Sequence, residues 1–95
     1  MADPTFEWDP AKAASNLRKH RVSFEDSKLA LADPRAIVEL DTSDPAEQRW
    51  RTTGLAANDV LFVVTTEPDD TTIRIISARK ATRHEQARYF RQALP

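Results

Sequence analysis

The feature that most constrains the fold is a double change in the spacing of apolar residues along the chain. After a short alternating start, apolar positions recur at helical spacing from about residue 10 to residue 31, alternate with a period of two from residue 36, and return to helical spacing after residue 82. Helices and strands bury apolar residues with different periods, so the two kinds of element follow one another in blocks. This order predicts an α+β fold in a single domain, residues 1–95, because half of this length would bury too little apolar surface for stability.

The first block predicts a short strand and two helices. Thr5–Trp8 alternates as a strand does, and Asp9 followed by Pro10 supplies an N-cap acceptor and a proline at the first helical position. We expect the first helix to run from about Pro10 to His20. The second begins after Ser23, which has an acid three residues on, and ends before Asp33-Pro34.

The middle block predicts a four-stranded antiparallel meander, in which Ala36, Val38 and Leu40 lie on one face of the first strand. The other three strands are expected at 48–55, 60–66 and 72–79. Thr82 and Glu85 then form a capping-box pattern at the start of a final helix. Its apolar side is expected to cover the sheet and consists of Ala87, Phe90 and Leu94.

Composition excludes several classes of protein. The chain has no apolar run of the length that a membrane span needs and no signal-like start, so we expect a cytoplasmic protein that binds no membrane. It has no cysteine and two isolated histidines, which disfavours disulfides, a metal site and metal catalysis, and we expect no cofactor.

The net charge of −1 conceals a strong asymmetry. Residues 1–70 hold 8 Lys and Arg against 14 Asp and Glu, whereas residues 71–95 hold 6 against 1. Phosphate contacts require an excess of cations, so the basic C-terminal quarter is the segment suited to nucleic acid.

This basic segment also holds the densest set of reactive side chains, which are Arg74, Arg79, Lys80, Arg83, His84, Glu85, Arg88, Tyr89 and Arg91. Metal-free RNA cleavage needs groups that move protons and cations that stabilise charge on the phosphorane. Glu85 and Tyr89 lie four residues apart, so with Arg88 they can converge on one helical face. The alternative interpretation is a solvated helix face with intrahelical ion pairs, on which Glu85 only caps the helix.

Two further clusters leave alternatives open. His20 follows Lys19 at the end of the first helix, where it can complement the helix dipole or, with the near-neutral titration typical of histidine, serve as acid or base. Trp50 is expected to be a core or sheet-face residue and not a platform on which a base stacks. Its neighbours Arg49 and Arg51 lie on the opposite face, where the local sequence alone favours solvated over catalytic side chains.

The short motifs form an ordered set along nearly the whole chain: Phe6-Glu7-Trp8-Asp9-Pro10-Ala11-Lys12, Ser15-Asn16-Leu17-Arg18-Lys19-His20, Val22-Ser23-Phe24-Glu25, Asp33-Pro34, Arg49 with Gly54, and Arg74-Ile75-Ile76-Ser77-Ala78-Arg79-Lys80-Ala81-Thr82 with Glu85 and Tyr89. In this order and at these separations the motifs resemble the BrnT family of toxins. The resemblance implies a RelE-like fold and a metal-independent endoribonuclease that arrests translation. It implies neutralisation by a cognate BrnA-like ribbon-helix-helix antitoxin, through which the complex contacts operator DNA, with a homodimer possible inside that complex.

The residues and the resemblance together give the expected site for an RNA substrate. The residues expected to be catalytic are Arg79, Glu85, Tyr89, His20 and Arg74. Those expected to bind RNA are Lys19, Arg49, Lys80 and Arg83. The alternative hypothesis is a binding module without catalysis, whose basic C-terminal segment docks an acidic partner or antitoxin.

The chain departs from the family pattern at Arg21, where BrnT toxins often have glycine. If this position is a left-handed helix C-cap, arginine costs roughly 1 kcal/mol there. We expect an RNA-facing loop to contain basic residues or glycine. The segment Leu55–Asp59 contains neither.

Overall fold

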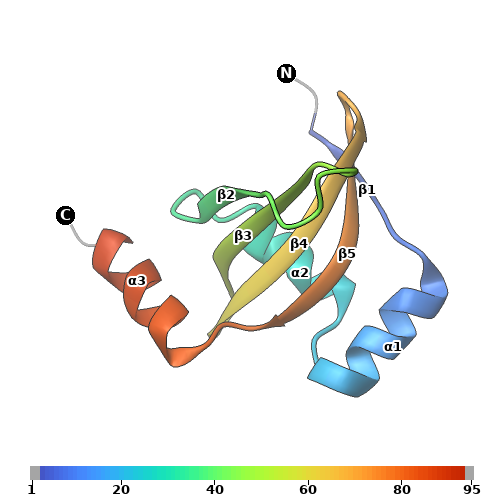
Figure 1. The fold of residues 1–95 in the computed structure, drawn as a ribbon. Coiled ribbons are helices and arrows are strands. Elements are labelled where there is room, and N and C mark those ends of the chain that lie inside the picture. The colour runs from blue at the N-terminus through green and yellow to red at the C-terminus, as the bar shows by residue number, and fades with distance from the viewer. Residues whose placement is uncertain (1–2, 94–95) are drawn as a thin grey trace.

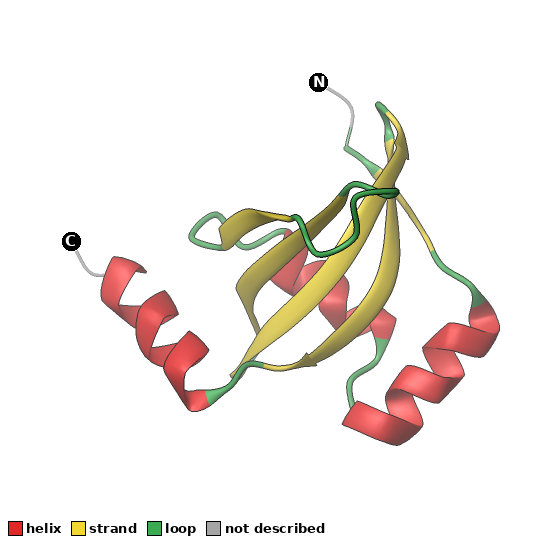
Figure 2. Ribbon diagram, viewed as in Figure 1, coloured by secondary structure: helices red, strands yellow, loops and turns green. Residues whose placement is uncertain are grey.

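The computed structural model describes residues 3–93 of the chain, which form three helices and five strands. Their order is β1 (Thr5–Glu7), α1 (Pro10–His20), α2 (Phe24–Leu31), β2 (Ile37–Asp41), β3 (Arg49–Ala56), β4 (Asp59–Asp69), β5 (Thr72–Lys80) and α3 (Arg83–Ala93). Figures 1 and 2 show one twisted sheet with α2 behind it and with α1 and α3 at its two sides. The α+β class and the order of elements are as predicted from the sequence.

The five strands form one mixed sheet in the order β1-β5-β4-β3-β2. Strands β2 to β5 are the predicted meander, because each pairs antiparallel with the next along the chain. Strand β1 completes the sheet by pairing in parallel with β5, with Thr5 opposite Thr72 and Glu7 opposite Arg74. The first segment of the chain therefore lies beside the basic last strand.

The predicted caps form the helix ends. Asp9 accepts a hydrogen bond from the amide of Ala11 at the start of α1, and Ser23 accepts one from the amide of Asp26 at the start of α2. Arg21 caps the C-terminus of α1 in the left-handed conformation, with φ of 58°, and its N–H donates to the carbonyl of Leu17. The backbone at Arg21 is therefore the one that glycine would adopt without strain.

The core lies between the sheet and α2. Phe24 and Ala30 of α2 pack with Val63, Ile75 and other buried residues of the central strands. Gly54 of β3 allows this close approach, since a Cβ atom there would lie 2.3 Å from the carbonyl oxygen of Ala30. Helix α2 therefore rests directly on the sheet backbone and covers one face of it.

Helix α1 is fastened to the edge of β5 by a buried amide. The Asn16 side chain accepts from the backbone N–H of Ala78 at 3.1 Å and donates to its carbonyl at 2.8 Å, as a neighbouring strand would. It also donates to the carbonyl of Val22. Polar groups buried in this way hold an element in one position, because breaking the contacts would leave them unsatisfied.

The prediction for the final helix is wrong in one respect, because its apolar side does not cover the sheet. Ala87 is exposed and Phe90 is 52% exposed, while Leu94 lies outside the described residues. Helix α3 instead leaves the end of β5 and stands at the side of the sheet (Figure 1). Its buried residue is Tyr89, which packs with Val60.

On β2 the predicted face of Ala36, Val38 and Leu40 is largely exposed: Val38 is 59% and Leu40 is 43% exposed. Strand β2 is at the edge of the sheet, beyond the part that the eight-residue α2 covers. No helix among residues 3–93 has the length and apolar character needed to cross a membrane.

Candidate functional site

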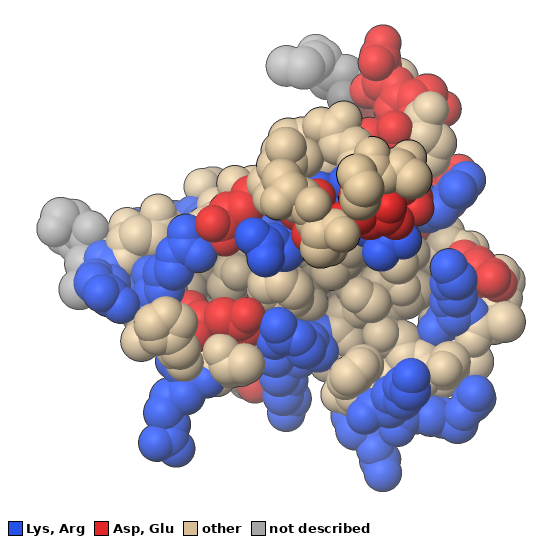
Figure 3. Space-filling view, viewed as in Figure 1, with Lys and Arg blue, Asp and Glu red and all other residues tan. Residues whose placement is uncertain are grey.

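The face of the sheet opposite α2 carries polar and charged side chains between the two flanking helices. Strand pairing places Phe62 opposite both Thr53 and Arg79, and the next row of this face places Val64 opposite both Arg51 and Ser77. We call this surface the open face. In Figure 3, Lys and Arg side chains project from both flanking helices and from the lower part of the sheet, whereas Asp and Glu gather mainly towards the top of the view.

Arg79 is a cation of the open face whose guanidinium is held by several neighbours. Its guanidinium lies 4.1 Å from the centroid of the Phe62 ring and makes two parallel hydrogen bonds, of 2.8 and 3.0 Å, to the carboxylate of Glu85. It also donates to the carbonyl of Lys80. A stacked and doubly bonded guanidinium loses little further freedom on meeting a phosphate, so Arg79 is a preorganised anion-binding group.

Glu85 holds Arg79 from the start of α3. The predicted capping box is present: the amide of Thr82 donates to Glu85, and the amide of Glu85 donates to the Thr82 hydroxyl. The bonds from Arg79, and to a lesser extent those from Thr82, lower the pKa of Glu85 from 4.5 to about 2. A carboxylate with this pKa stays ionised at neutral pH and is a poor proton carrier there.

Tyr89 lies apart from Arg79, although the sequence predicts that Glu85, Arg88 and Tyr89 converge. Its side chain is buried, and its hydroxyl donates to the carboxylate of Asp33. Burial, with the bond to Asp33, raises the pKa of Tyr89 to about 12. Arg88 pairs with Glu39 of β2 instead. The three side chains fasten α3 to three different elements and do not form one catalytic cluster.

The loop residue Asp33 supports α3 and was not among the predicted site residues. Its carboxylate accepts from the amides of Arg35 and Leu55 as well as from the Tyr89 hydroxyl. Burial raises the pKa of Asp33, but these bonds together outweigh it and hold the pKa below its ordinary value. In the sequence, Asp33-Pro34 indicates only the end of a helix. The hydrogen bond between Asp33 and Tyr89 of α3 depends on the tertiary structure.

His20 and Lys19 lie beside the open face on the side of α1. They line a hollow of about 200 Å³ together with Ser77 of β5, Ile76 and residues of α1. Ser77 and Arg79 are two residues apart on the same strand and face, about 7 Å at 3.3 Å per residue. The structure therefore brings His20 to the same region of the open face as Arg79.

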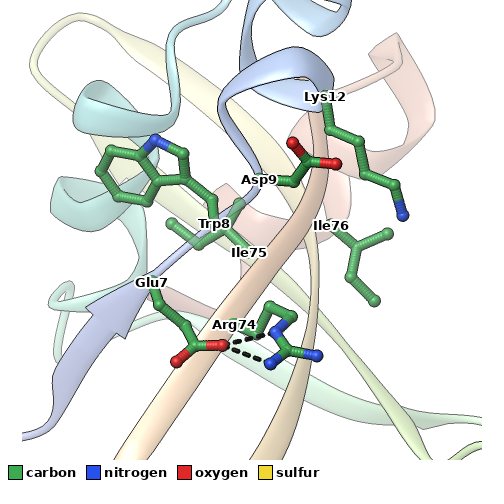
Figure 4. A pocket seen from close by; sticks show the side chains of 7 residues that line it. All are labelled: Glu7, Trp8, Asp9, Lys12, Arg74, Ile75 and Ile76. Carbon is green, nitrogen blue, oxygen red and sulfur yellow. Dashed lines mark hydrogen bonds and ion pairs between the residues drawn. The ribbon is translucent and has the colours of Figure 1, made fainter.

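The remaining predicted residues lie around this centre. Arg74 pairs with Glu7 on the neighbouring β1, and both line a second hollow of about 360 Å³ (Figure 4). Arg49 pairs with Glu47 at the start of β3. Two predicted residues do not lie on the open face. Lys80, opposite Leu61, points to the other face of the sheet near Asp59, and Arg83 is exposed at the start of α3.

Three residues of the open face and its border were not among the predicted site residues: Lys12, Arg51 and Ser77. Lys12 lines both hollows beside α1. The Nε atom of Arg51 is buried without a hydrogen-bond partner, as is that of Arg49. Alternation along β3 places the two arginines on one face, but only the strand register brings that face to Ser77 and Arg79. No group of three His, Asp or Glu side chains with metal-binding geometry occurs within residues 3–93.

Comparison with known proteins identifies a family and a solved structure of similar fold. Residues 8–85 match a family model described as the ribonuclease toxin, BrnT, of a type II toxin-antitoxin system. The fold is similar to the 1.1 Å crystal structure of the Brucella abortus ribonuclease toxin BrnT, with a TM-score of 0.68 and 23% sequence identity, over 84% of this chain and 99% of that one. No curated protein sequence matches.

Proposed function

This chain belongs to the BrnT family of ribonuclease toxins of type II toxin-antitoxin systems, since the family model matches residues 8–85, and on that premise we propose that it cleaves RNA without a metal ion on the open face. In this proposal Arg79 holds the scissile phosphate and His20 moves a proton. The observation that carries it is the preorganised guanidinium of Arg79, stacked on Phe62 and fixed by Glu85 beside a hollow that His20 lines.

The reaction that suits these groups uses the 2′-hydroxyl of the RNA as the nucleophile. Its oxygen bonds to the adjacent phosphorus, the bond from phosphorus to the 5′ oxygen breaks, and the products are a cyclic phosphate and a free 5′-hydroxyl. The 2′-hydroxyl proton passes to water, and the imidazolium of His20 donates a proton to the leaving oxygen. Arg79 stabilises the charge on the equatorial oxygens of the phosphorane, which is the part that a metal ion would otherwise take.

Glu85 and Tyr89 are positioning residues in this proposal. Glu85 fixes the plane of the Arg79 guanidinium, and its low pKa keeps it ionised for that task. Tyr89 holds α3, and with it Glu85, against the body of the protein through Asp33. Lys19 contacts RNA directly, because it lines the same hollow as His20.

Four other cations contribute to the field that attracts RNA. Arg83 is exposed at the start of α3, Arg49 pairs with Glu47 at the start of β3, and Lys80 lies near Asp59 on the other face of the sheet. Arg74 is exposed beside Glu7 and takes an electrostatic role at the far end of β5. Charges of this kind raise the rate at which RNA arrives more than they stabilise the transition state.

The family description includes a toxin-antitoxin system, so an antitoxin is the partner of this chain. We extend the proposal to a BrnA-like ribbon-helix-helix antitoxin, to contact with operator DNA through that antitoxin, and to two toxin copies in the complex. The family resemblance supports these three points. Light scattering of the co-purified complex and footprinting on the operator, with and without the antitoxin, would test them.

The central test is cleavage by antitoxin-free protein in the presence of EDTA. We expect RNA products with cyclic phosphate ends, and we expect Arg79→Ala to lose cleavage while keeping its far-UV circular dichroism. Arg91→Ala is the matched control, because it removes an exposed arginine from α3. A folded preparation that binds but cleaves no RNA would instead support the binding module without catalysis.

A further inference from the structure

The two hollows beside α1 are adjacent, because Lys12 and Ile76 line both the hollow that contains His20 and the hollow that contains Arg74. We call the two hollows together the groove. The floor is β5, with Ile76 and Ser77, and the wall is α1. Figure 4 shows the far end, where Lys12 extends beside Ile76 and the pair of Glu7 and Arg74 lies across the strand.

The wall of the groove carries two lysines on one stripe of α1. Lys12 and Lys19 are seven residues apart, which is two helical turns or about 10 Å along the axis. Asn16 lies between them on the same stripe, and its bonds to the backbone of Ala78 hold α1 against β5. The two ammonium groups are therefore carried by a wall whose position is fixed before any ligand binds.

These lysines are free to meet an anion. Within residues 3–93 neither Lys12 nor Lys19 enters an ion pair, whereas Arg74, Arg79 and Lys80 of β5 are all paired with acids. The two carboxylates at the far end are already engaged: Glu7 pairs with Arg74, and Asp9 caps the N-terminus of α1. The formal charges of Glu7, Asp9, Lys12 and Arg74 therefore cancel at the far end, whereas the hollow that contains His20 is lined by Lys12 and Lys19 and by no carboxylate.

We propose that this groove holds the single-stranded RNA that flanks the scissile bond, with Lys12 and Lys19 each contacting a backbone phosphate. The inference rests on the proposed function, because the cationic end of the groove opens beside His20 and Arg79, where the phosphate is cleaved. The half-buried Ile76 gives an apolar floor and the Ser77 hydroxyl gives a donor for a ribose or phosphate oxygen. RNA then runs along β5 and does not cross the sheet towards Arg51.

The test measures how binding depends on salt. The probe is a fully 2′-O-methylated oligoribonucleotide, which has no nucleophilic hydroxyl and stays intact. We expect Lys12→Gln and Lys19→Gln each to weaken binding and to reduce the slope of log K against log salt by about 0.7, the value for one phosphate contact in a single strand. Arg18→Gln is the matched control on the same helix, because Arg18 lines a different hollow with Leu17 and Arg21, and its slope should equal that of the wild type.

Two outcomes would overturn the inference while leaving the proposed function intact. If both lysine variants keep the wild-type slope and the protein still cleaves unmodified RNA, the substrate follows another path. If they keep the slope but lose affinity for the antitoxin, the groove binds a protein segment instead. Loss of cleavage in the wild type, with the lysine-dependent slope present, would contradict the proposed function alone.

Discussion

Replacing Glu85 by glutamine tests the central claim about the open face, that a carboxylate fixes Arg79. Glutamine keeps a carbonyl oxygen for the capping box but loses the charge that faces the guanidinium. A pKa lowered from 4.5 to about 2 corresponds to at most about 3 kcal/mol of unfolding free energy. Because 24% of the Glu85 side chain and 35% of the Arg79 side chain are exposed, solvent screening reduces the expected loss to about 1–2 kcal/mol.

The sign of the pH dependence follows from the direction of this pKa. A carboxyl group whose pKa is lowered by folding adds stability above its ordinary pKa of 4.5 and loses that contribution as the pH falls towards 2. Urea unfolding followed by fluorescence of Trp8 and Trp50 should therefore show a gap between wild type and Glu85→Gln that is full at pH 7 and nearly closed at pH 2.5. The other carboxyls with lowered pKa values, such as Asp33 and Glu39, are present in both proteins and cancel in the comparison.

Activity separates a positioning role from a proton-transfer role. If Glu85 only orients Arg79, the variant should lose about 5- to 30-fold in kcat/KM, the factor that matches 1–2 kcal/mol. The pH-rate profile should keep its shape, because Glu85 transfers no proton in the proposed mechanism. A stability gap that stays constant down to pH 2.5, or a limb of the profile that vanishes in Glu85→Gln, would refute this reasoning.

Three further substitutions test the supports of the site. Tyr89→Phe removes a buried hydrogen bond to the ionised Asp33, so it should cost about 1.5–3 kcal/mol in urea unfolding, and an unchanged unfolding midpoint would contradict a structural role for that bond. Arg21→Gly relieves the backbone strain of a non-glycine residue in the left-handed C-cap and should stabilise the folded protein by about 1 kcal/mol. Tm should rise by roughly 4–8 °C, and a lower Tm would mean that Arg21 is unstrained. Gly54→Ala places a Cβ atom against the carbonyl of Ala30 and should destabilise by about 1–3 kcal/mol, and a variant of wild-type stability would contradict the close packing of α2.

The helix ends could be predicted closely because the signals are local. Asp9 and Ser23 form caps with amides two and three residues away, and the bounds of α1 follow from them. The place of β1 could not be predicted, since its pairing with β5 joins residues that are 67 apart. The exposure of the apolar side of α3 was missed for a similar reason. The apolar pattern identifies one face of the helix but not the element against which that face packs, and Phe90 is largely exposed to solvent.

The candidate site was predicted in part. The basic segment around Arg79 follows from composition, and the bond between Glu85 and Thr82 follows from the capping box, because both signals are local in the sequence. The pair of Arg79 and Glu85 was not predicted. The sequence offered no signal that Tyr89 would turn away towards Asp33, because that contact depends on how α3 leaves the sheet. Lys12 was missed because it is one exposed lysine on a helix, and only the packing of α1 beside β5 makes it part of a groove.

The way in which α3 is attached links the position of Arg79 to the surface of the protein. Most of the contacts that hold α3 are polar: Glu85 to Arg79, Gln86 to the carbonyl of Ala81, Arg88 to Glu39, Tyr89 to Asp33 and Gln92 to the carbonyl of Arg35. Among its described side chains, Tyr89 is the buried one. Partly exposed ion pairs contribute little free energy each, so this helix is held less firmly than α1 or α2. Any movement of α3 displaces Glu85 and releases the guanidinium that it orients. An antitoxin that binds α3 would therefore disable Arg79 without having to fill the open face.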